Sequence, residues 1–208
     1  MKVIIADDHV ILREGIRQIL DCESDIEVVG EASDGAELFK LILENKVDVI
    51  VLDITMPGQS GLEILKDVTR LYPKTPVIML SMHRSDQYAL RSFRAGASGY
   101  LTKQAASDEL VAAIRTAHRG EKYVNSEVAG IFANFFKKGE PAELHALLSD
   151  RELEVFRLIA LGIGLSQIGQ QMNLSVKTIS TYRSRIMEKT GFLSNADITR
   201  YSIENKLS

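Results

Sequence analysis

Short apolar segments alternate with amphipathic segments over the first 120 residues, and this alternation limits the folds open to the chain. The apolar segments have the length and composition of buried strands and lie at 2–6, 26–31, 47–52, 76–80 and 98–102. Helical periodicity predicts helices near 9–21, 34–45, 60–71, 85–95 and 106–118. Because the connections are short, the pattern predicts a parallel sheet covered by helices on both faces.

Five parallel strands joined by right-handed crossovers can be arranged in few ways. The order 2-1-3-4-5 of the flavodoxin-like fold accommodates five strands, and ligands bind at the carboxyl ends of the strands in such sheets. We therefore expect an α/β module over residues 1–120, a flavodoxin-like doubly wound five-stranded parallel sheet. A binding site is expected at the carboxyl edge of this sheet.

The remainder of the chain has no strand pattern. Residues 125–137 predict one more helix, and "KKGEPAE" at 137–143 indicates an exposed linker because Gly and Pro interrupt the helical pattern. "SDRE" at 149–152 is a capping box that begins a helix, and turn signals follow at 173–175 and 191–194. We expect a helical or flexible linker over 121–146 and an all-α four-helix helix-turn-helix domain over 147–208.

Composition and charge narrow the classes of protein. The 45% hydrophobic and 25% charged residues are those of a globular protein, and a lone cysteine, Cys22, excludes an internal disulfide. We expect Cys22 to be buried or half-buried. No apolar run approaches the roughly 20 residues that cross a bilayer, and no signal peptide is recognisable, so we expect a cytoplasmic protein without a membrane partner. Net charge is −4 over residues 1–120 and +2 over 147–208, which favours cation binding by the first module and polyanion binding by the last.

Acidic residues follow two strands that are neighbours in the predicted sheet. Asp7 and Asp8 come directly after the first strand, and Asp53 ends the third. Three ionised carboxylates at one edge repel one another unless a cation compensates them. Carboxylate oxygens, a backbone carbonyl and waters are the ligands that Mg²⁺ prefers, so the sequence predicts a magnesium site.

A hydroxyl and an ammonium end the two remaining central strands. Ser81 ends the fourth strand and Lys103 follows the fifth. A carboxylate can attack phosphorus to form an acyl phosphate, whose oxygens then need positive charge or hydrogen bonds. Taken alone, each residue is more typical of a helix cap, a turn or a solvated lysine. Together they predict a site with one carboxylate nucleophile, in which Mg²⁺, Lys103 and Ser81 bind the transferred group.

The segments "ADDH", "LDITMPGQSGLE", "LSMH" and "AGASGYLTK" resemble the signature stretches of a response-regulator receiver domain, and the resemblance spans residues 1–120. It implies that Asp53 accepts a phosphoryl group from a sensor histidine kinase. It also implies that Asp8, Asp53 and the main-chain carbonyl of Thr55 hold Mg²⁺, with Asp7 acting partly through water. A degenerate receiver that only mediates contacts is the alternative.

The resemblance further implies a switch pair, Ser81 and Tyr100. In the family, the hydroxyl moves toward the phosphoryl group and the aromatic ring turns inward. Serine here replaces the commoner threonine, which keeps the hydroxyl and removes one methyl group.

The segment "SVKTISTYRSRIMEK" at 175–189 separates apolar and polar positions on a helical wheel, with Ile179, Tyr182 and Ile186 on one side. A basic polar face on the second helix of a helix-turn-helix fits the major groove of DNA. The basic residues would lie near phosphates, and Ser180, Thr181 and Ser184 near base edges. The candidate DNA contacts are Lys177, Thr178, Ser180, Thr181, Tyr182, Arg183, Ser184, Arg185 and Lys189. From charge alone, a solvated amphipathic helix explains the pattern equally well.

The stretch from Leu148 to Gly191 is similar to the four-helix LuxR-type domain of NarL/FixJ regulators, in the version with "KTxSTYRxR". Many relatives carry Lys at Ser180 or Ser184, so fewer direct base contacts are expected here. Gly169 stands where the family usually has Ala. The last helix, near 194–207, either packs on the bundle or helps to form a DNA-bound dimer.

The combined prediction is a two-component response regulator that is phosphorylated on Asp53 and binds promoter DNA, with homodimers expected on phosphorylation and RNA polymerase a further candidate partner. Pairing could use the helix-four to strand-five surface or the helix-one to helix-five face. Two other classes stay open. An enzyme that hydrolyses phosphate esters is disfavoured because Thr55 stands where a second acid would act, so we expect no activity beyond Asp53 itself. A constitutive DNA-binding or scaffolding protein is the third.

Overall fold

The computed structural model describes residues 1–82, 86–138, 144–205 and 207. The chain divides into two compact units, 1–137 and 138–208. The segment 121–137, which we predicted as linker, therefore packs with the first unit. The predicted exposed linker at 137–143 lies outside the described residues from 139 onward.

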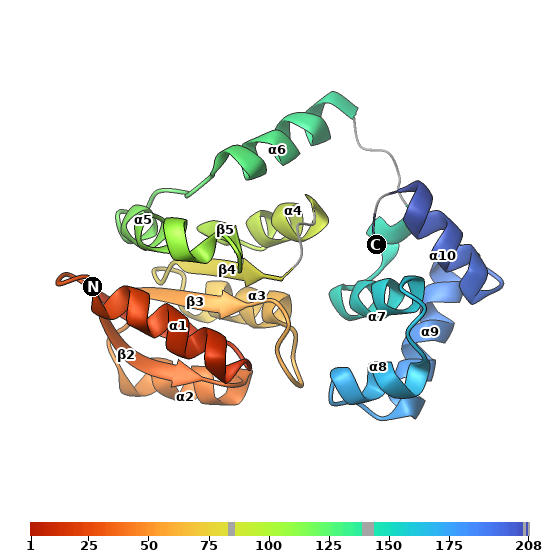
Figure 1. Cartoon of the computed structure of the whole chain (residues 1–208), viewed down its shortest axis with the longest axis horizontal. Helices are drawn as coiled ribbons and strands as arrows, with labels where there is room; N and C mark the ends of the chain where they lie inside the picture. Colours follow the sequence, from red (N-terminus) through yellow and green to blue (C-terminus); the bar gives the residue numbers. More distant parts are fainter. Residues whose placement is uncertain (83–85, 139–143, 206, 208) are drawn as a thin grey trace. The chain divides into compact units, whose positions relative to one another are not determined.

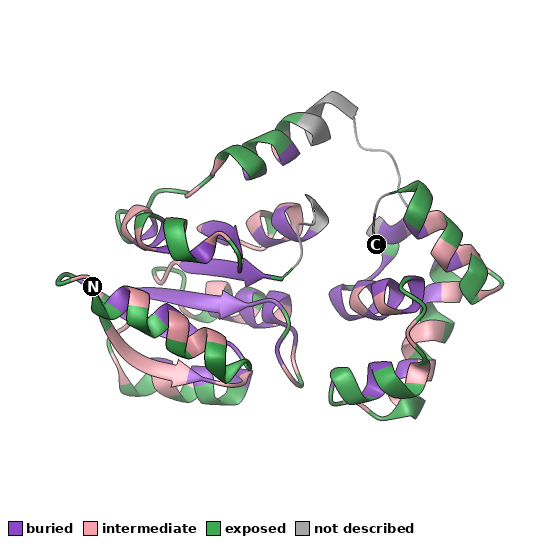
Figure 2. Ribbon diagram, viewed as in Figure 1, coloured by how far each residue is buried: buried purple, intermediate pink, exposed green. Residues whose placement is uncertain are grey.

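The first unit is built on a five-stranded parallel sheet with the order β2-β1-β3-β4-β5, which confirms the predicted topology (Figure 1). The strands are β1 (Lys2–Ala6), β2 (Glu27–Ala32), β3 (Val49–Asp53), β4 (Val77–Ser81) and β5 (Gly99–Thr102). Every residue of β3, β4 and β5 is buried, as expected for apolar strands covered on both faces (Figure 2). The carboxyl ends of all five strands meet at one edge.

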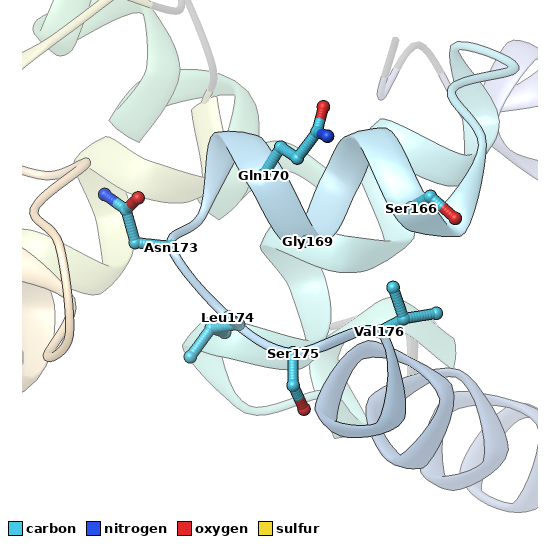
Figure 3. Close-up of a pocket in the computed structure, with 7 residues that line it drawn as sticks. All are labelled: Ser166, Gly169, Gln170, Asn173, Leu174, Ser175 and Val176. Carbon is cyan, nitrogen blue, oxygen red and sulfur yellow. The ribbon is translucent and has the colours of Figure 1, made fainter.

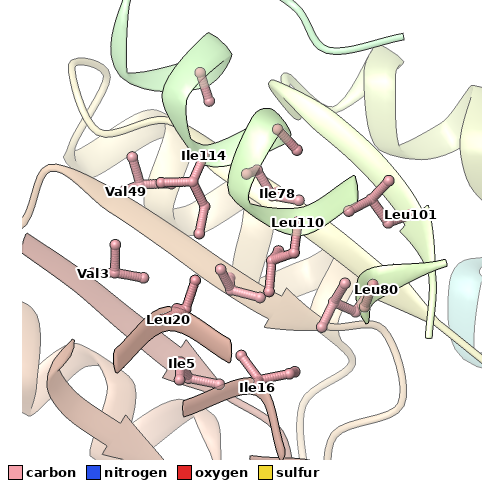
Figure 4. Packing of buried hydrophobic residues seen from close by; sticks show 14 of the residues in the cluster. Val3, Ile5, Ile16, Leu20, Val49, Ile78, Leu80, Leu101, Leu110 and Ile114 are labelled. Atoms are coloured by element: carbon pink, nitrogen blue, oxygen red, sulfur yellow. The ribbon is translucent and has the colours of Figure 1, made fainter. Parts of the chain in front are cut away.

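Five helices cover the two faces of this sheet, as predicted. They are α1 (Val10–Asp21), α2 (Gly35–Glu44), α3 (Gly61–Leu71), α4 (Asp86–Arg94) and α5 (Ala106–His118). On one face, Ile16 and Leu20 of α1 and Leu110 and Ile114 of α5 pack on the sheet residues as one fully buried cluster (Figure 4). The polar side chains that follow these strands are therefore attached to a closely packed part of the fold.

The segment after α5 extends the first unit. Tyr123 forms a parallel bridge with Gly99 of β5. The next helix, α6 (Ser126–Lys138), packs on α4 through the rings of Phe132 and Phe93, whose centroids lie 5.2 Å apart. The helix predicted at 125–137 is thus present and is attached to the α4–β5 side of the sheet.

The second unit is helical, as predicted. A 3-10 turn η1 (Leu144–Leu147) precedes α7 (Asp150–Ala160), α8 (Leu165–Gln171), α9 (Val176–Thr190) and α10 (Asn195–Glu204). The predicted capping box is confirmed, because Glu152 N–H donates to Ser149 Oγ and Ser149 N–H donates to Glu152 Oε2. Gly191, in the left-handed conformation with φ of 73°, ends α9.

Cys22 corrects one expectation. It is exposed, not buried or half-buried. The residue follows the last turn of α1, where its thiol donates to the Gln18 carbonyl at 3.3 Å and does not reach the core.

Among the helices of the described residues, none combines the length and the apolar character needed to cross a membrane.

Candidate functional site

The structure brings the three predicted carboxylates together at the carboxyl edge of the sheet. Asp7 and Asp8 follow β1, and Asp53 is the last residue of the neighbouring β3. With His9, they offer ligand atoms that all lie within 4.8 Å of one another. Asp7 and Asp53 are fully buried, whereas the side chain of Asp8 is 34% exposed. Of the three carboxylates, Asp8 is therefore the one that solvent reaches.

Lys103 supplies part of the compensating charge. It follows β5 and places Nζ 2.7 Å from Asp7 Oδ2 and 2.8 Å from Asp53 Oδ2. The prediction that a metal ion compensates these carboxylates is therefore incomplete, because a lysine at the end of β5 also reaches both buried carboxylates. One ammonium does not neutralise three carboxylates, so the site retains negative charge.

The surroundings of Asp53 raise the pKa of its carboxyl group. Burial, and then the neighbouring Asp7 carboxylate, raise the pKa of Asp53 to about 7, although Lys103 acts in the opposite direction. Asp53 Oδ1 is buried and has no hydrogen-bond partner among the described residues. A buried, unsatisfied oxygen beside two further carboxylates fits a hard divalent cation such as Mg²⁺. A hydrogen bond from the backbone of Thr55 to the Asp53 carboxylate acts in the same direction as Lys103, and so it partly offsets the rise in the pKa.

The predicted switch residues lie on the two neighbouring strands. Ser81 is the last residue of β4 and Tyr100 lies on β5, and both are buried. The register pairs Ser81 with Thr102, two residues beyond Tyr100. If Ser81 moved toward Asp53, its pairing partner Thr102 on β5 would be displaced, and Thr102 is two residues from Tyr100.

A glycine that the sequence reasoning missed fixes the loop after Asp53. The N–H of Gly61 donates to the Ile54 carbonyl at 2.8 Å. A Cβ at Gly61 would lie 1.9 Å from the main-chain oxygen of Asp53, which no side chain can do. The start of α3 thus rests directly on the backbone of Asp53. Gly61 lies within the quoted segment "LDITMPGQSGLE", but its contact with Asp53 depends on how α3 packs against the end of β3.

Two further residues missed earlier brace the loop that carries Asp7 and Asp8. Arg13, one helical turn into α1, donates to the main-chain oxygen of Asp7 and forms an ion pair with Glu31 of β2 at 3.3 Å. In the sequence, only the short distance of Arg13 from "DDH" indicated that it could contact this loop. Glu31 gave no such indication, because its role depends on the pairing of β2 with β1.

In the second unit, α9 has an apolar and a polar face, as its sequence predicts. Tyr182, predicted on the apolar side, differs, because it is only half-buried and lines the polar face. Ile179 and Ile186 are buried, whereas Lys177, Thr181 and Arg185 are exposed. Five residues of the candidate DNA face line an open hollow of about 290 Å³: Lys177, Thr178, Thr181, Tyr182 and Arg185. The hydroxyls of Thr181 and Ser184 donate to carbonyls one turn earlier in the helix, at 3.0 and 3.1 Å, which leaves their oxygens as outward acceptors.

The other two basic residues of α9 have partners within the unit. Arg183 Nε donates to Asn195 Oδ1 at 2.7 Å, and Lys189 Nζ lies 2.6 Å from Glu152 Oε2. Burial opposes ionisation of Glu152, but hydrogen bonds from Lys189 and Ser149 hold the pKa of its carboxyl below the usual value. Lys177 and Arg185 form no ion pair within the described part of the chain.

The turn between α8 and α9 explains Gly169. Leu174 N–H donates to the Gly169 carbonyl at 2.8 Å, and a Cβ at Gly169 would lie 2.8 Å from the Leu174 oxygen. Asn173 takes a positive φ of 53°, which tightens the turn. Gly169 and residues of this turn line an open hollow of about 460 Å³ (Figure 3).

The last helix, α10, packs on the bundle, which is one of the two roles predicted for it. Ile198 is buried, and the Tyr201 ring lies 5.3 Å from that of Phe192. The Tyr201 hydroxyl is 3.0 Å from Nδ1 of His145. Ile203 is 66% exposed, so packing accounts for Ile198 and Tyr201 and not for Ile203.

Each of the two modules matches the model of a known protein family. "Response regulator receiver domain" matches residues 3–115, and "Bacterial regulatory proteins, luxR family" matches residues 146–202. The oxygen regulatory protein NreC of Staphylococcus aureus (strain MRSA252) is 36% identical over 214 residues, which cover 100% of this chain and 99% of that protein. NreC of Staphylococcus carnosus (strain TM300) is 34% identical over the same shares.

Solved structures of a response regulator, RcsB, are also similar to this chain. The RcsB response regulator of Salmonella typhimurium has a TM-score of 0.70 at 29% identity, with 97% of this chain and 96% of that chain covered. RcsB of Salmonella enterica serovar Typhimurium, bound to promoter rprA with the phosphomimetic BeF3-, has a TM-score of 0.67 at 29% identity, with 97% of both chains covered. Two RcsB dimers bound to two parallel DNAs have a TM-score of 0.62 at 30% identity, with 97% and 96% covered.

Proposed function

Because this chain belongs to the NarL/FixJ family of response regulators, in which phosphorylation controls DNA binding and transcription, we propose that Asp53 is its phosphoacceptor and a sensor histidine kinase its phosphoryl donor. The observation that carries the proposal is the buried Asp53 carboxylate, within reach of Lys103 Nζ and grouped with Asp7 and Asp8. Promoter DNA lies in the bacterial cytoplasm, so the proposal places the protein there.

In the proposed transfer, an oxygen of the ionised Asp53 carboxylate attacks phosphorus and forms an O–P bond while the bond from phosphorus to the donor nitrogen breaks. The departing imidazole takes up a proton. Before the transfer, Asp53 Oδ2 accepts a hydrogen bond from the Lys103 ammonium. The Lys103 ammonium then binds an oxygen of the new acyl phosphate, and Ser81 donates to another. Later hydrolysis of this acyl phosphate completes the only chemistry we propose.

A magnesium ion, when bound, would stabilise negative charge on the transferred phosphoryl group. Asp8, Asp53 and the Thr55 carbonyl would hold it, with Asp7 partly through water. The unsatisfied Asp53 Oδ1 and the oxygen-rich ligand set support this assignment.

The proposed response passes from Ser81 and Tyr100 to the α4 side of the sheet. α4 packs on β5, and α6 packs on α4 through Phe93 and Phe132. A shift of α4 would therefore also displace α6, the helix that precedes the second unit along the chain. We propose that it favours a homodimer, as RcsB forms on DNA, and that RNA polymerase is a further partner at the promoter.

Asp53→Asn tests the phosphoacceptor directly. The variant should incorporate no phosphoryl label from a small-molecule donor, whereas the wild type should approach one label per chain. The variant is expected to fold, because it removes a buried carboxyl whose ionised form is already disfavoured. With beryllofluoride, sedimentation should show a dimer of the wild type and a monomer of the variant.

Asp21→Asn is the matched control, since Asp21 is exposed at the end of α1. It should be labelled like the wild type. Stoichiometric labelling of Asp53→Asn would contradict the assignment of Asp53, and an unchanged mass of the wild type with beryllofluoride would contradict dimerisation driven by phosphorylation.

For the DNA interface, we propose that Lys177 and Arg185 contact phosphates directly. Arg183 and Lys189 would first have to leave Asn195 and Glu152. Thr178, Ser180, Thr181, Tyr182 and Ser184 are the proposed contacts to base edges or adjoining backbone. The exposure of Lys177 and Arg185 around one hollow on α9 supports the proposal.

Lys177→Ala and Arg185→Ala should each weaken binding to any duplex and reduce the slope of log affinity against log salt by about 0.9, the value for one phosphate contact. Fluorescence anisotropy with a random duplex at several salt concentrations measures this slope. Arg200→Ala, an exposed arginine paired with Asp197 on α10, is the control and should leave it unchanged. Equal slopes for all four proteins would exclude the α9 face as the phosphate contact.

A further inference from the structure

His9 adjoins the acidic site in a way that neither helix capping nor the proposed phosphotransfer explains. It is the N-cap residue of α1, but its side chain makes no capping hydrogen bond. Its ring is turned to the carboxylates instead. Nδ1 lies 2.7 Å from Asp8 Oδ1 and 3.1 Å from Asp7 Oδ1. The main-chain N–H of His9 donates to Asp7 Oδ1 at 2.8 Å, which holds the residue against the site.

The ligand atoms have the spread that one cation can bridge. Those of Asp7, Asp8, His9 and Asp53 all lie within 4.8 Å of one another. Opposite ligands of an octahedral ion with bonds of roughly 2.1 Å are about 4.2 Å apart, so a small closure of the group is sufficient. Asp53 Oδ1, buried and without a hydrogen-bond partner in the described chain, shows that the group is more than a set of surface acids.

We propose that His9 Nδ1 is a further ligand of the site and makes it prefer a divalent transition ion, such as Co²⁺, Ni²⁺ or Zn²⁺, to Mg²⁺. The inference rests on the proposed function, which places a divalent cation among these carboxylates. Mg²⁺ takes oxygen ligands, whereas imidazole nitrogen suits the first-row transition ions. Carboxylate oxygens only accept hydrogen bonds, so Nδ1 carries a proton while it lies 2.7 Å from Asp8 Oδ1. A metal ion that binds Nδ1 would displace this proton and take the ring lone pair.

The exposure of His9 allows this ligation. Its side chain is 56% exposed, so the ring can adjust without repacking the core. Asp8, on the same loop, is also partly exposed and can move with it. A transition ion bound in this way would occupy the oxygens that Mg²⁺ needs, so the two ions would compete.

His9→Asn is the variant that isolates the nitrogen ligand. Asparagine is a favoured N-cap residue, so the start of α1 is kept while the imidazole is removed. His118→Asn is the matched control, because His118 is exposed at the end of α5 and outside the group of ligand atoms. Calorimetry of the full chain with Co²⁺ and with Mg²⁺ gives the ratio of the two affinities, and pulsed EPR of bound Mn²⁺ reports whether imidazole nitrogen is a ligand.

We expect His9→Asn to weaken Co²⁺ binding about tenfold or more, the scale on which single groups at a metal site change affinity. Its affinity for Mg²⁺ should stay the same, and the ¹⁴N modulation should disappear. His118→Asn should behave as the wild type. If both ions bind and His9→Asn changes neither the ratio nor the modulation, the inference is wrong while the proposed function stands. If neither ion binds the wild type, the metal step of the proposed function fails with it.

Discussion

Gly61→Ala should destabilise the first unit by about 3 kcal/mol, the upper range for inserting atoms into a packed site. The new Cβ would lie 1.9 Å from the Asp53 main-chain oxygen and 2.8 Å from the Ile54 Cα. Because both contacts are to backbone, no side-chain rotation relieves them. The start of α3 must move away from β3, and Asp53 must move with the loop. Urea unfolding measures the loss, and phosphoryl labelling of the folded fraction should fall as well.

Gly15→Ala is the control for Gly61→Ala. Gly15 lies inside α1, and nothing is within 4 Å of the Cβ it would gain. This substitution should leave stability unchanged or raise it by up to about 1 kcal/mol, since alanine favours a helix over glycine. If the two variants were equally stable, the close approach of α3 to Asp53 would be wrong.

Lys103→Met should cost about 3 kcal/mol in a metal-free buffer at pH 8, because removing one partner of a buried ion pair leaves the other uncompensated. Here two carboxylates, Asp7 and Asp53, lose the ammonium that lies 2.7 and 2.8 Å from them. Added Mg²⁺ should restore part of the loss by replacing the missing positive charge. Denaturant unfolding with EDTA and with Mg²⁺ measures both effects.

The effect of Lys103→Met should depend on pH. In the wild type, burial and Asp7 raise the pKa of Asp53 from 3.8 to about 7, so the folded state holds a proton that the unfolded state has lost. Metal-free stability from this group is therefore highest below pH 4 and falls as the pH rises through about 7. Without Lys103, the pKa of Asp53 rises further and the fall continues to higher pH. The cost of Lys103→Met should thus be greater at pH 8 than at pH 5.5.

Lys46→Met is the matched control for Lys103→Met. Lys46 is exposed in the loop after α2, where no ion pair holds it among the described residues. Its replacement should change stability by less than about 0.5 kcal/mol at either pH. A cost for Lys103→Met that is small, or the same at both pH values, would mean that Lys103 does not compensate the carboxylates.

The sequence by itself determined the order of the strands, the carboxylates at their ends and the two faces of α9. The strands, the carboxylates after them and the faces of α9 follow from local patterns of apolar and polar positions. The strand order follows from these strands together with the right-handed crossover rule. The same reasoning failed for Cys22, since the end of a helix can face water or the core with no local sign of which.

Only the tertiary structure decided how charge is distributed in the site. Lys103 follows β5, whereas Asp7 follows β1 and Asp53 ends β3, so these residues meet only because the strands lie side by side in one parallel sheet. A local sequence pattern does not predict the distances between them. The same holds for Gly61 beneath Asp53, for Lys189 on Glu152 and for the ring of His9 against Asp8. Each contact joins atoms whose separation depends on the packing of whole elements, which is why composition and spacing predicted the residues but not their partners.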